Sequence, residues 1–424
     1  SVGPLLLPRK RDNTVKLKAA SMNLQRMEAL FVITLLCGPF QPKTVQGYEA
    51  LPLRSAVNAT SLGLRQVIRA EKLGIGKRIG GQICHFHRYW GLIRMHFPDV
   101  ATVVDVGANK GLVSSHIISL WRPDLRVLPE KLVPHFKAYF AEHNISTNPC
   151  GPCTCPPVKE HVAGPYPERS PGVGFEVHSL EPSRNLAGLS RRLAIEHFVN
   201  ASALWTWHPV ALSDAPGHVM FDTKWGEGSK LLLDGKHSSL NETAASKVWN
   251  TLHHTPGTPE YVRVAVSTVD RFAARHHLDS IDILKIDAEG VDLKVLVGAG
   301  LLFEARKVKL VVWEMPVGPF PVSFPSASGV AHQVGSYREL VAFLSAVAGM
   351  ECYMPLEFGV VLSLRYWHAD LQGRGHGRLD RGNMLCVSRQ HLPALIVALD
   401  RRSLALLSEE NLHVLAPTYM VDNQ

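Results

Sequence analysis

The stretch VVDVGANKG, residues 103–111, decides the fold, because an apolar run ends in Asp105 and turns at once into a glycine-containing loop. This order predicts a strand, a tight turn and the start of a helix. Gly107 and Gly111 allow the backbone to approach a ligand closely, and the first turn of the helix offers unpaired N–H groups. The stretch therefore predicts a nucleotide-like ligand at the end of the strand. The alternative is an ordinary corner in which Asn109 caps the helix.

The spacing of the glycines argues against a nicotinamide dinucleotide. That fingerprint needs glycines at the first, third and sixth positions of the turn, and here the third and sixth positions hold Asn109 and Leu112. Asp105 argues the same way, since a carboxylate at the mouth of the turn repels a pyrophosphate. It suits a ligand with an ammonium and a sulfonium group, such as S-adenosylmethionine. We therefore expect Asp105 to face a cationic cofactor.

Residues 281–290, IDILKIDAEG, form the second informative stretch. Its isoleucines and leucine predict a buried parallel strand, and Lys285, Asp287 and Glu289 recur at every second position as the strand ends. In an open parallel sheet that end faces the ligand crevice, which favours a functional site. The alternative has Asp287 capping the following helix and Glu289 complementing its dipole.

Two other acids follow predicted strands. The strand at 175–182 places Glu181 where a carboxylate can accept hydrogen bonds from both hydroxyls of a ribose, although an acid that favours helix entry is an equal alternative. The strand at 208–214 ends in Asp214, which could bind an adenine amino group. Turn chemistry explains this Asp-x-Pro-Gly sequence equally well.

The later part of the chain completes a doubly wound pattern. A strand at 309–316 delivers Glu314, and the loop 316–330, rich in Pro, Ser and Phe, is either a lid over the crevice or an idle surface loop. Two nearly adjacent strands, at 351–358 and 383–390, predict an antiparallel terminal strand. Residues 122–172 show neither helical nor strand periodicity, so we expect an insertion there.

Composition places the chain among globular proteins: 424 residues, 46% of them hydrophobic and 19% charged. The formal net charge of +8 comes mostly from the first 26 residues, which hold six Lys and Arg side chains against one Asp. The remainder is nearly balanced. We therefore expect no nucleic-acid partner.

The first 45 residues have the pattern of a targeting or disordered segment. Arg26 followed by ALFVITLLC, residues 29–37, has the charge and apolar length of a signal peptide and is too short to form a stable transmembrane span. No clean small-x-small cleavage site follows. A transit peptide, a buried helix, or a gene model whose true start is Met22 or Met27 are the alternatives.

The glycosylation sequons favour a lumenal or secreted protein, with an organelle or the cytoplasm as the alternatives. Glycosylation sequons occur at Asn58, Asn144, Asn200 and Asn241. Outside the candidate signal peptide six of the 7 cysteines remain, an even number that permits disulfides without requiring them.

A cysteine cluster lies within the expected insertion. Cys150, Cys153 and Cys155, with His143 or His161, could form a zinc site, but the spacing is uncommon for structural zinc. The flanking turn-forming residues favour a disulfide-stapled loop instead. We expect no metal.

The two informative stretches, taken with SLEPSRNLAGL, VALSDAPGHVMF and VSTVDRF, resemble in order and wording the FkbM family of S-adenosylmethionine-dependent methyltransferases. The resemblance covers residues 101 to about 316 and the closing NMLCV, interrupted by the insertion. It implies an α/β class I methyltransferase (Rossmann-like) fold. That fold has a seven-stranded, mostly parallel sheet with helices on both faces and an antiparallel terminal strand.

The resemblance also implies where S-adenosylmethionine binds. Its methionine part would lie among residues of the first stretch: Asp105, Gly107, Asn109 and Gly111. Glu181 would hold the ribose, Asp214 would lie near the adenine, and Asp287 would face the transferred methyl group.

Family members resemble O-methyltransferases of sugars and natural products, so we expect a small-molecule or glycan acceptor. Asp287 is the first candidate for the general base, with Glu289, Lys285 and Glu314 in reserve. A nicotinamide-dependent oxidoreductase and a non-catalytic binding protein that keeps the fold are the alternative functions.

The expected organisation has four parts: a targeting or disordered segment at 1–45, a helical segment at 46–98, the methyltransferase domain at 99–390, and a helical tail at 391–424.

Overall fold

The computed structural model describes residues 87–142, 166–222, 231–232, 261–314, 320–355, 361–364 and 383–405. All of them belong to one compact unit of the chain, Arg54–Gln424. The expectations for the targeting segment 1–45 and for the cysteine cluster at 150–155 lie outside the described residues.

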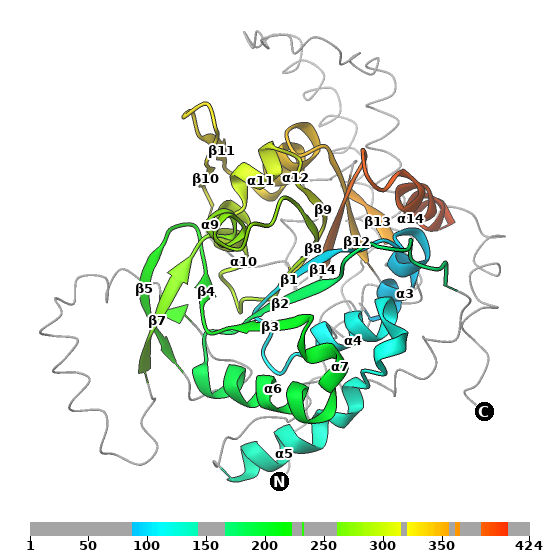
Figure 1. Cartoon of the computed structure of the whole chain (residues 1–424). Coiled ribbons are helices and arrows are strands. Elements are labelled where there is room, and N and C mark those ends of the chain that lie inside the picture. Colours follow the sequence, from blue (N-terminus) through cyan, green and yellow to red (C-terminus); the bar gives the residue numbers. More distant parts are fainter. Residues whose placement is uncertain are drawn as a thin grey trace, which may run out of the picture. The chain divides into compact units, whose positions relative to one another are not determined.

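An eight-stranded sheet organises this unit (Figure 1), in the order β13-β12-β14-β9-β8-β1-β2-β3. The strands are β1 (Thr102–Val106), β2 (Glu176–Leu180), β3 (Trp205–His208), β8 (Ile281–Ile286), β9 (Val308–Glu314), β12 (Met350–Pro355), β13 (Val361–Ser363) and β14 (Asn383–Ser388). Five neighbouring strands, in the order β9, β8, β1, β2 and β3, run parallel to one another. Strand β14 lies between β9 and β12 and is antiparallel to both. The predicted seven-stranded, mostly parallel sheet with an antiparallel terminal strand is confirmed, and β13 adds a further antiparallel strand at the edge.

The central strands are apolar because both of their faces are covered. All six residues of β8 are buried, and alternate side chains of β1 enter opposite cores: Val104 one, Val103 the other. A strand covered on two sides carries a continuous apolar run instead of an alternating one. The position of β1 and β8 at the centre of the sheet therefore explains the two apolar stretches of the sequence.

Helices form a layer on each face. One core is closed by α9 (Val269–Arg275), α10 (Asp292–Val297), α11 (Gly300–Glu304) and α12 (Tyr337–Ala346). The opposite core is closed by α3 (His87–His96), α4 (Leu112–Trp121), α6 (Arg184–His197) and α14 (Pro393–Ala405). This layering is the doubly wound arrangement that the alternating pattern predicts.

The prediction of the third strand at 208–214 is wrong in its bounds. The third strand of the main sheet is β3, and it ends at His208 because Pro209 has no N–H to continue the ladder. The chain then enters a second sheet with the order β4-β7-β5-β6. Its strands are β4 (Ala211–Leu212), β5 (Gly217–Asp222), β6 (Leu231–Leu232) and β7 (Tyr261–Ser267).

The insertion is more regular than its sequence predicts. Its described part contains α5 (Val133–Glu142) and two short 3-10 helices, Pro123–Leu125 and Pro129–Lys131. Phe136 of α5 and the preceding Leu132 are buried in the core that α4 closes. Two apolar anchors are too few to set a period in the sequence, yet they hold this helix against the domain.

The remaining described elements are a hairpin of β10 (Val322–Phe324) and β11 (His332–Val334), and the four-residue helix α7 (Val199–Ser202). A disulfide joins Cys352 and Cys386, which stand opposite each other in the antiparallel pair of β12 and β14. Within the described residues, no helix has the length and apolar character that a membrane crossing needs.

Candidate functional site

The turn after β1 needs glycine at two positions because other residues of the domain lie against its backbone there. Gly107 has φ +69°, and a Cβ there would lie 1.9 Å from the backbone oxygen of Asp287. Gly111 has φ +73°, and a Cβ there would lie 2.6 Å from Trp207 and 2.7 Å from Trp205. The expectation that these glycines make room for a ligand is therefore wrong, because protein takes the space: the Asp287 backbone at Gly107 and two indole rings at Gly111.

Glu181 is held rigidly at the end of β2. Asn109 N–H donates to Oε2 at 3.0 Å, and Ser183 N–H donates to Oε1 at 2.9 Å. The residue is only 6% exposed, and burial raises the pKa of Glu181 to about 7, against the lowering effect of the two backbone donors. Because its two oxygens are each engaged from one side, their remaining lone pairs can accept hydrogen bonds from a ligand.

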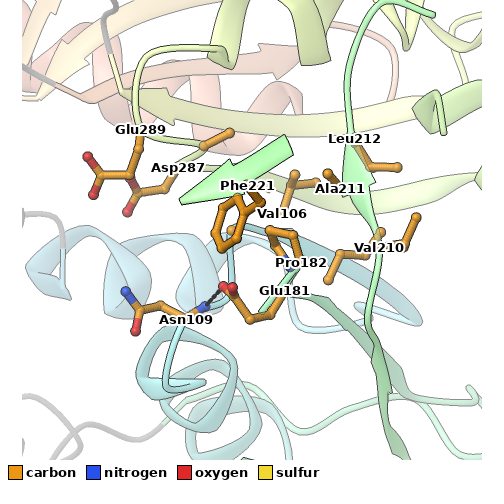
Figure 2. A pocket seen from close by; sticks show the side chains of 13 residues that line it. Val106, Asn109, Glu181, Pro182, Val210, Ala211, Leu212, Phe221, Asp287 and Glu289 are labelled. Carbon is orange, nitrogen blue, oxygen red and sulfur yellow. Dashed lines mark hydrogen bonds between the residues drawn. The ribbon is translucent and has the colours of Figure 1, made fainter. Parts of the chain in front are cut away.

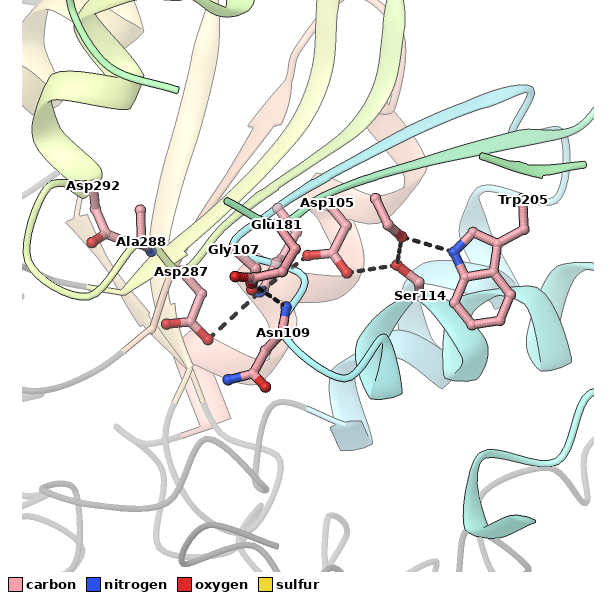
Figure 3. A network of polar contacts seen from close by, with 11 residues as sticks. Asp105, Gly107, Asn109, Ser114, Glu181, Trp205, Asp287, Ala288 and Asp292 are labelled. Carbon is pink, nitrogen blue, oxygen red and sulfur yellow. Dashed lines mark hydrogen bonds and ion pairs between the residues drawn. The ribbon is translucent and has the colours of Figure 1, made fainter. Parts of the chain in front are cut away.

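Asp105 lies beneath the turn, away from the ligand space (Figure 3). It is fully buried, accepts a hydrogen bond from Ser114 Oγ at 2.6 Å, and its Oδ1 lies 3.0 Å from Lys285 Nζ. We expected Asp105 to face a cationic cofactor. The structure corrects this, because the cation beside Asp105 is a side chain of the neighbouring strand β8.

Lys285 connects three parts of the site. Its ammonium donates to the carbonyl oxygen of Gly107 at 3.2 Å and lies 3.5 Å from Asp287 Oδ2. Burial alone would lower the pKa of Lys285, but the charges of Asp105 and Asp287 outweigh burial and raise it. The side chain therefore stays protonated at neutral pH. This excludes the predicted reserve role of Lys285 as a general base.

Carboxylates gather where β8 and β9 end. Ile286 pairs with Trp313 in register, so Asp287 and Glu314 follow at neighbouring positions. Burial, and then the charges of Asp287, Asp292 and Glu289, raise the pKa of Glu314 to about 7. Crowding of like charges in a partly dry region is typical of sites that handle protons.

Sequence reasoning missed Asp292. Its side chain accepts hydrogen bonds from the backbone N–H groups of Ala288 at 3.3 Å and Gly290 at 3.2 Å, and so braces the loop that carries Asp287 and Glu289. Burial, followed by the charge of Asp287, raises the pKa of Asp292 to about 6. An acid two residues after a glycine, in the first turn of α10, is the sequence signal that could have identified it.

A pocket opens where these strand ends meet (Figure 2). Its empty space of about 590 Å³ includes open solvent. Figure 2 shows the side chains that line it. Five predicted site residues line it: Gly107, Asn109, Glu181, Asp287 and Glu289. Its other walls come from Val106, Leu180, Pro182, Val210, Ala211, Leu212, Phe221 and Ala288.

Five predicted site residues do not line this pocket: Asp105, Gly111, Lys285, Asp214 and Glu314. Asp214 is exposed, accepts a hydrogen bond from Ser213 Oγ at 2.9 Å, and lines a separate cavity between α10 and the β10–β11 hairpin. The reason is the early end of β3, which carries Asp214 out of the main sheet. Phe221 on β5 reaches the pocket instead, and the sequence pattern does not identify it because it sits in an ordinary extended segment.

The described part of the Pro-rich loop, from residue 320 onward, is packed against the domain. Phe324 is fully buried and stacks on Phe343, with ring centroids 4.3 Å apart. Its residues line the cavity that holds Asp214, not the pocket at the strand ends. This part of the loop is therefore neither an idle surface loop nor a cover for that pocket.

Comparison with known proteins finds one family model that matches part of the chain. Residues 166–344 match the model of the methyltransferase FkbM domain. These residues are similar to an FkbM methyltransferase domain. The FkbM match includes Glu181, Asp214 and the segment from Lys285 to Glu314, whereas the turn at 103–111 precedes it.

Two solved structures are similar to this chain. The crystal structure of methyltransferase FkbM from Methylobacillus flagellatus KT is 12% identical with a TM-score of 0.32, and the match covers 69% of this chain and 44% of that one. A likely methyl transferase from Burkholderia thailandensis, bound to S-adenosyl-homocysteine, is 9% identical with a TM-score of 0.23, with 86% and 92% covered. No protein of curated function matches the chain.

Proposed function

We propose that the FkbM domain binds S-adenosylmethionine in the pocket at the strand ends and transfers its methyl group to a hydroxyl of a carbohydrate or small-molecule acceptor. The observation that carries this proposal is Glu181, a buried carboxylate held by two backbone donors at the pocket wall. Such a group costs free energy in an empty site and gains it back when ribose hydroxyls donate to it.

The pocket residues fit the parts of this cofactor. Glu181 would accept the ribose hydroxyls, and the apolar wall of Val210, Leu212 and Phe221 would hold the adenine ring. This wall replaces Asp214, which lies outside the pocket. The turn residues Gly107 and Asn109 would border the methionine part.

Bound S-adenosylmethionine supplies a methyl group on a sulfonium, which is a strong electrophile. The protein then has to align the acceptor oxygen, exclude water and remove a proton. Asp287 lines the pocket and is our first candidate for the group that takes the proton. Glu314 is the reserve, because a carboxyl group with a pKa of about 7 can accept a proton at neutral pH. Glu289 also lines the pocket and would contact the acceptor.

Lys285 and Asp105 would act as positioning residues. The Lys285 ammonium lies between Asp105 and Asp287 and also holds the carbonyl of Gly107. It thereby fixes the carboxylate of Asp287 relative to the turn. The ammonium also places a positive charge 3.5 Å from Asp287 Oδ2.

Ligand titration and a transfer assay test the proposal together. We expect calorimetry to detect binding of S-adenosylmethionine and not of NAD(P)H, and we expect labelled cofactor to methylate at least one hydroxylated compound in a panel of glycans, lipids and small molecules. Asp287→Ala should abolish transfer while cofactor binding persists. Binding of NAD(P)H alone would support an oxidoreductase, and cofactor binding without transfer to any acceptor would support a binding protein.

We also propose that the protein works in the secretory pathway. The disulfide between Cys352 and Cys386 supports an oxidising compartment, as does the exposed sequon at Asn200 on α7. Cell fractionation tests this, with endoglycosidase sensitivity as the second readout. A protein without glycans that fractionates with the cytosol would contradict it.

A further inference from the structure

A second cavity lies at the opposite edge of the sheet. It is formed by the ends of α3 and α4 and by the segment before β2, and its walls include Arg94, Arg122, Arg169, Trp121, Asp124 and Tyr166. Arg169 Nη2 donates at 2.8 Å to the carbonyl oxygens of Val100 and Gly174, which lead into β1 and β2. The cavity is therefore at the amino-terminal ends of the strands, whereas the pocket is at their carboxyl ends.

Arg94 is buried without a direct ion pair, and its guanidinium lies 5.7 Å from the centroid of the Tyr166 ring. Only 4% of the residue is exposed, and its Nε donates to the carbonyl oxygen of Leu120 at 3.1 Å. Its Nη1 is buried and has no hydrogen-bond partner, and Arg94 forms no ion pair in the described part of the chain. Arginine is rarely buried unless it is paired, and an unsatisfied buried donor destabilises the folded state.

Arg169, which is only partly buried, also has an unsatisfied donor in the same cavity. Its Nη2 donates to neutral carbonyl oxygens, and its Nε is buried with no partner. Burial lowers the pKa of Arg94, and the charge of Arg169 lowers it further, which reflects two like charges close together. Carbonyl groups satisfy donors but do not neutralise a charge.

The acids around the cavity are engaged elsewhere or exposed. Asp124 accepts two hydrogen bonds from Arg122, at 2.9 and 2.7 Å. Asp99 accepts from Ser170 N and Oγ, both at 2.7 Å; its charge acts on Arg94 and Arg169 without a direct ion pair. Glu168, at the rim, is exposed. None of these side chains satisfies the two free guanidinium donors.

We propose that this cavity binds a small oxyanion, a phosphate or carboxylate group, between Arg94 and Arg169. Planar guanidinium groups match the geometry of such oxyanions, and the hydrogen bonds are strengthened by charge. A water molecule would satisfy the free donors, but it carries no negative charge to form an ion pair with either guanidinium group. The site is distinct from the methyl-transfer pocket, and the inference does not depend on the proposed function.

Anion titration of the full chain tests the site. Inorganic phosphate, sulfate and acetate are titrated by calorimetry at constant ionic strength set with chloride, and thermal unfolding is followed in parallel. We expect at least one of these anions to bind and to raise the unfolding temperature above that in chloride. Arg94→Gln should weaken that binding about tenfold or more. Binding of phosphate and sulfate but not of acetate would identify a phosphate-like ligand. Binding of acetate alone would identify a carboxylate ligand.

Arg192→Gln is the matched control. Arg192 lies on α6 with 66% of its side chain exposed, so the substitution removes the same charge without touching the cavity. The control should bind the anion like the wild type, and Arg94→Gln should keep its affinity for S-adenosylmethionine. Arg169→Gln serves as the second variant if Arg94→Gln fails to fold. The proposal is overturned if no anion binds better than chloride, or if the control loses binding as much as the cavity variants.

Discussion

Glu181 shows how burial tunes a single residue. A pKa of about 7 leaves the carboxyl group roughly half ionised at neutral pH, although its ordinary pKa is 4.5. The ionised form is the one that accepts hydrogen bonds from both hydroxyls of a ribose. Cofactor binding is therefore coupled to the release of a proton from this residue.

The first prediction concerns this coupling. Above a pH of about 7 the Glu181 carboxylate is ionised, and below it each pH unit should weaken S-adenosylmethionine binding by up to about tenfold. Calorimetry from about pH 5.5 to about 8.5 measures this dependence. Glu181→Gln should bind weakly and lose that dependence, whereas Glu314→Gln should keep it. An affinity that is constant over this range in the wild type would show that Glu181 does not hold the ribose.

The same variant has a readout without any ligand. The raised pKa means that the folded state of the free protein holds the Glu181 proton more tightly than the unfolded state does. This contribution to stability is complete below the unfolded pKa and is lost as the pH rises through about 7. Because glutamine cannot ionise, Glu181→Gln should lose less stability than the wild type between pH of about 5 and 8. An identical slope in denaturant unfolding would contradict the raised pKa.

The second prediction separates two costs at a glycine. Gly107→Ala should destabilise the protein by more than about 2 kcal/mol, because a left-handed backbone costs about 1–2 kcal/mol and the new Cβ also meets the carbonyl of Asp287. Gly172 is the matched control, with φ +82° and nothing within 4 Å of an added Cβ. Denaturant unfolding of Gly107→Ala and Gly172→Ala measures the loss of unfolding free energy in each, and the difference between the two losses is the steric cost of the contact with Asp287. Equal losses would show that the contact with Asp287 does not matter.

At the scale of elements, the ends of three neighbouring parallel strands build the site. β1 ends at the turn, β2 delivers Glu181, and β8 delivers Lys285 and Asp287. Hydrogen bonds and ion pairs connect these ends, so the loops that follow them are fixed relative to one another. The arrangement follows from the fold, because parallel strands bring their carboxyl ends to one edge.

The third prediction tests the ion pair between β1 and β8. Lys285→Met should destabilise the domain by about 3–5 kcal/mol, because it leaves the Asp105 charge buried without a cation. The double variant Asp105→Asn with Lys285→Met should recover a large part of that loss, since no charge then stays unpaired. Chemical denaturation of the wild type, the two single variants and the double variant measures the coupling free energy between the two side chains. Additive losses in the double variant would show that the two side chains do not interact.

At the scale of the whole described unit, the late strands are joined covalently. β12 lies beside β14 and not beside β9, and the disulfide of Cys352 and Cys386 links the two across a sequence separation of 34. Both cysteines are buried in the core that α12 closes. The link therefore restrains the antiparallel end of the sheet, away from the pocket.

The fourth prediction concerns this link. The double variant Cys352→Ala with Cys386→Ala should lose about 2–4 kcal/mol of stability under non-reducing conditions, because its unfolded chain is less restrained. Denaturant unfolding with and without a reducing agent measures the effect. The wild type should fall toward the variant on reduction, whereas the variant should not respond. A wild type that is indifferent to reduction would contradict the disulfide.

The sequence alone determined the fold class and the polar side chains that line the pocket. Apolar runs that end in Asp105, Glu181 and Asp287 indicate three strands of a parallel sheet. Because parallel strands bring their carboxyl ends to one edge, Glu181 and Asp287 could be assigned to one site from the sequence. Tertiary structure decided which side of each strand end faces the ligand. The side chain of Asp105 turns inward to Lys285, and Pro209 ends β3 early enough to move Asp214 out of the pocket and to leave its wall to Phe221. Periodicity shows where a strand ends, but the partner of a buried charge depends on residues that are far away in sequence.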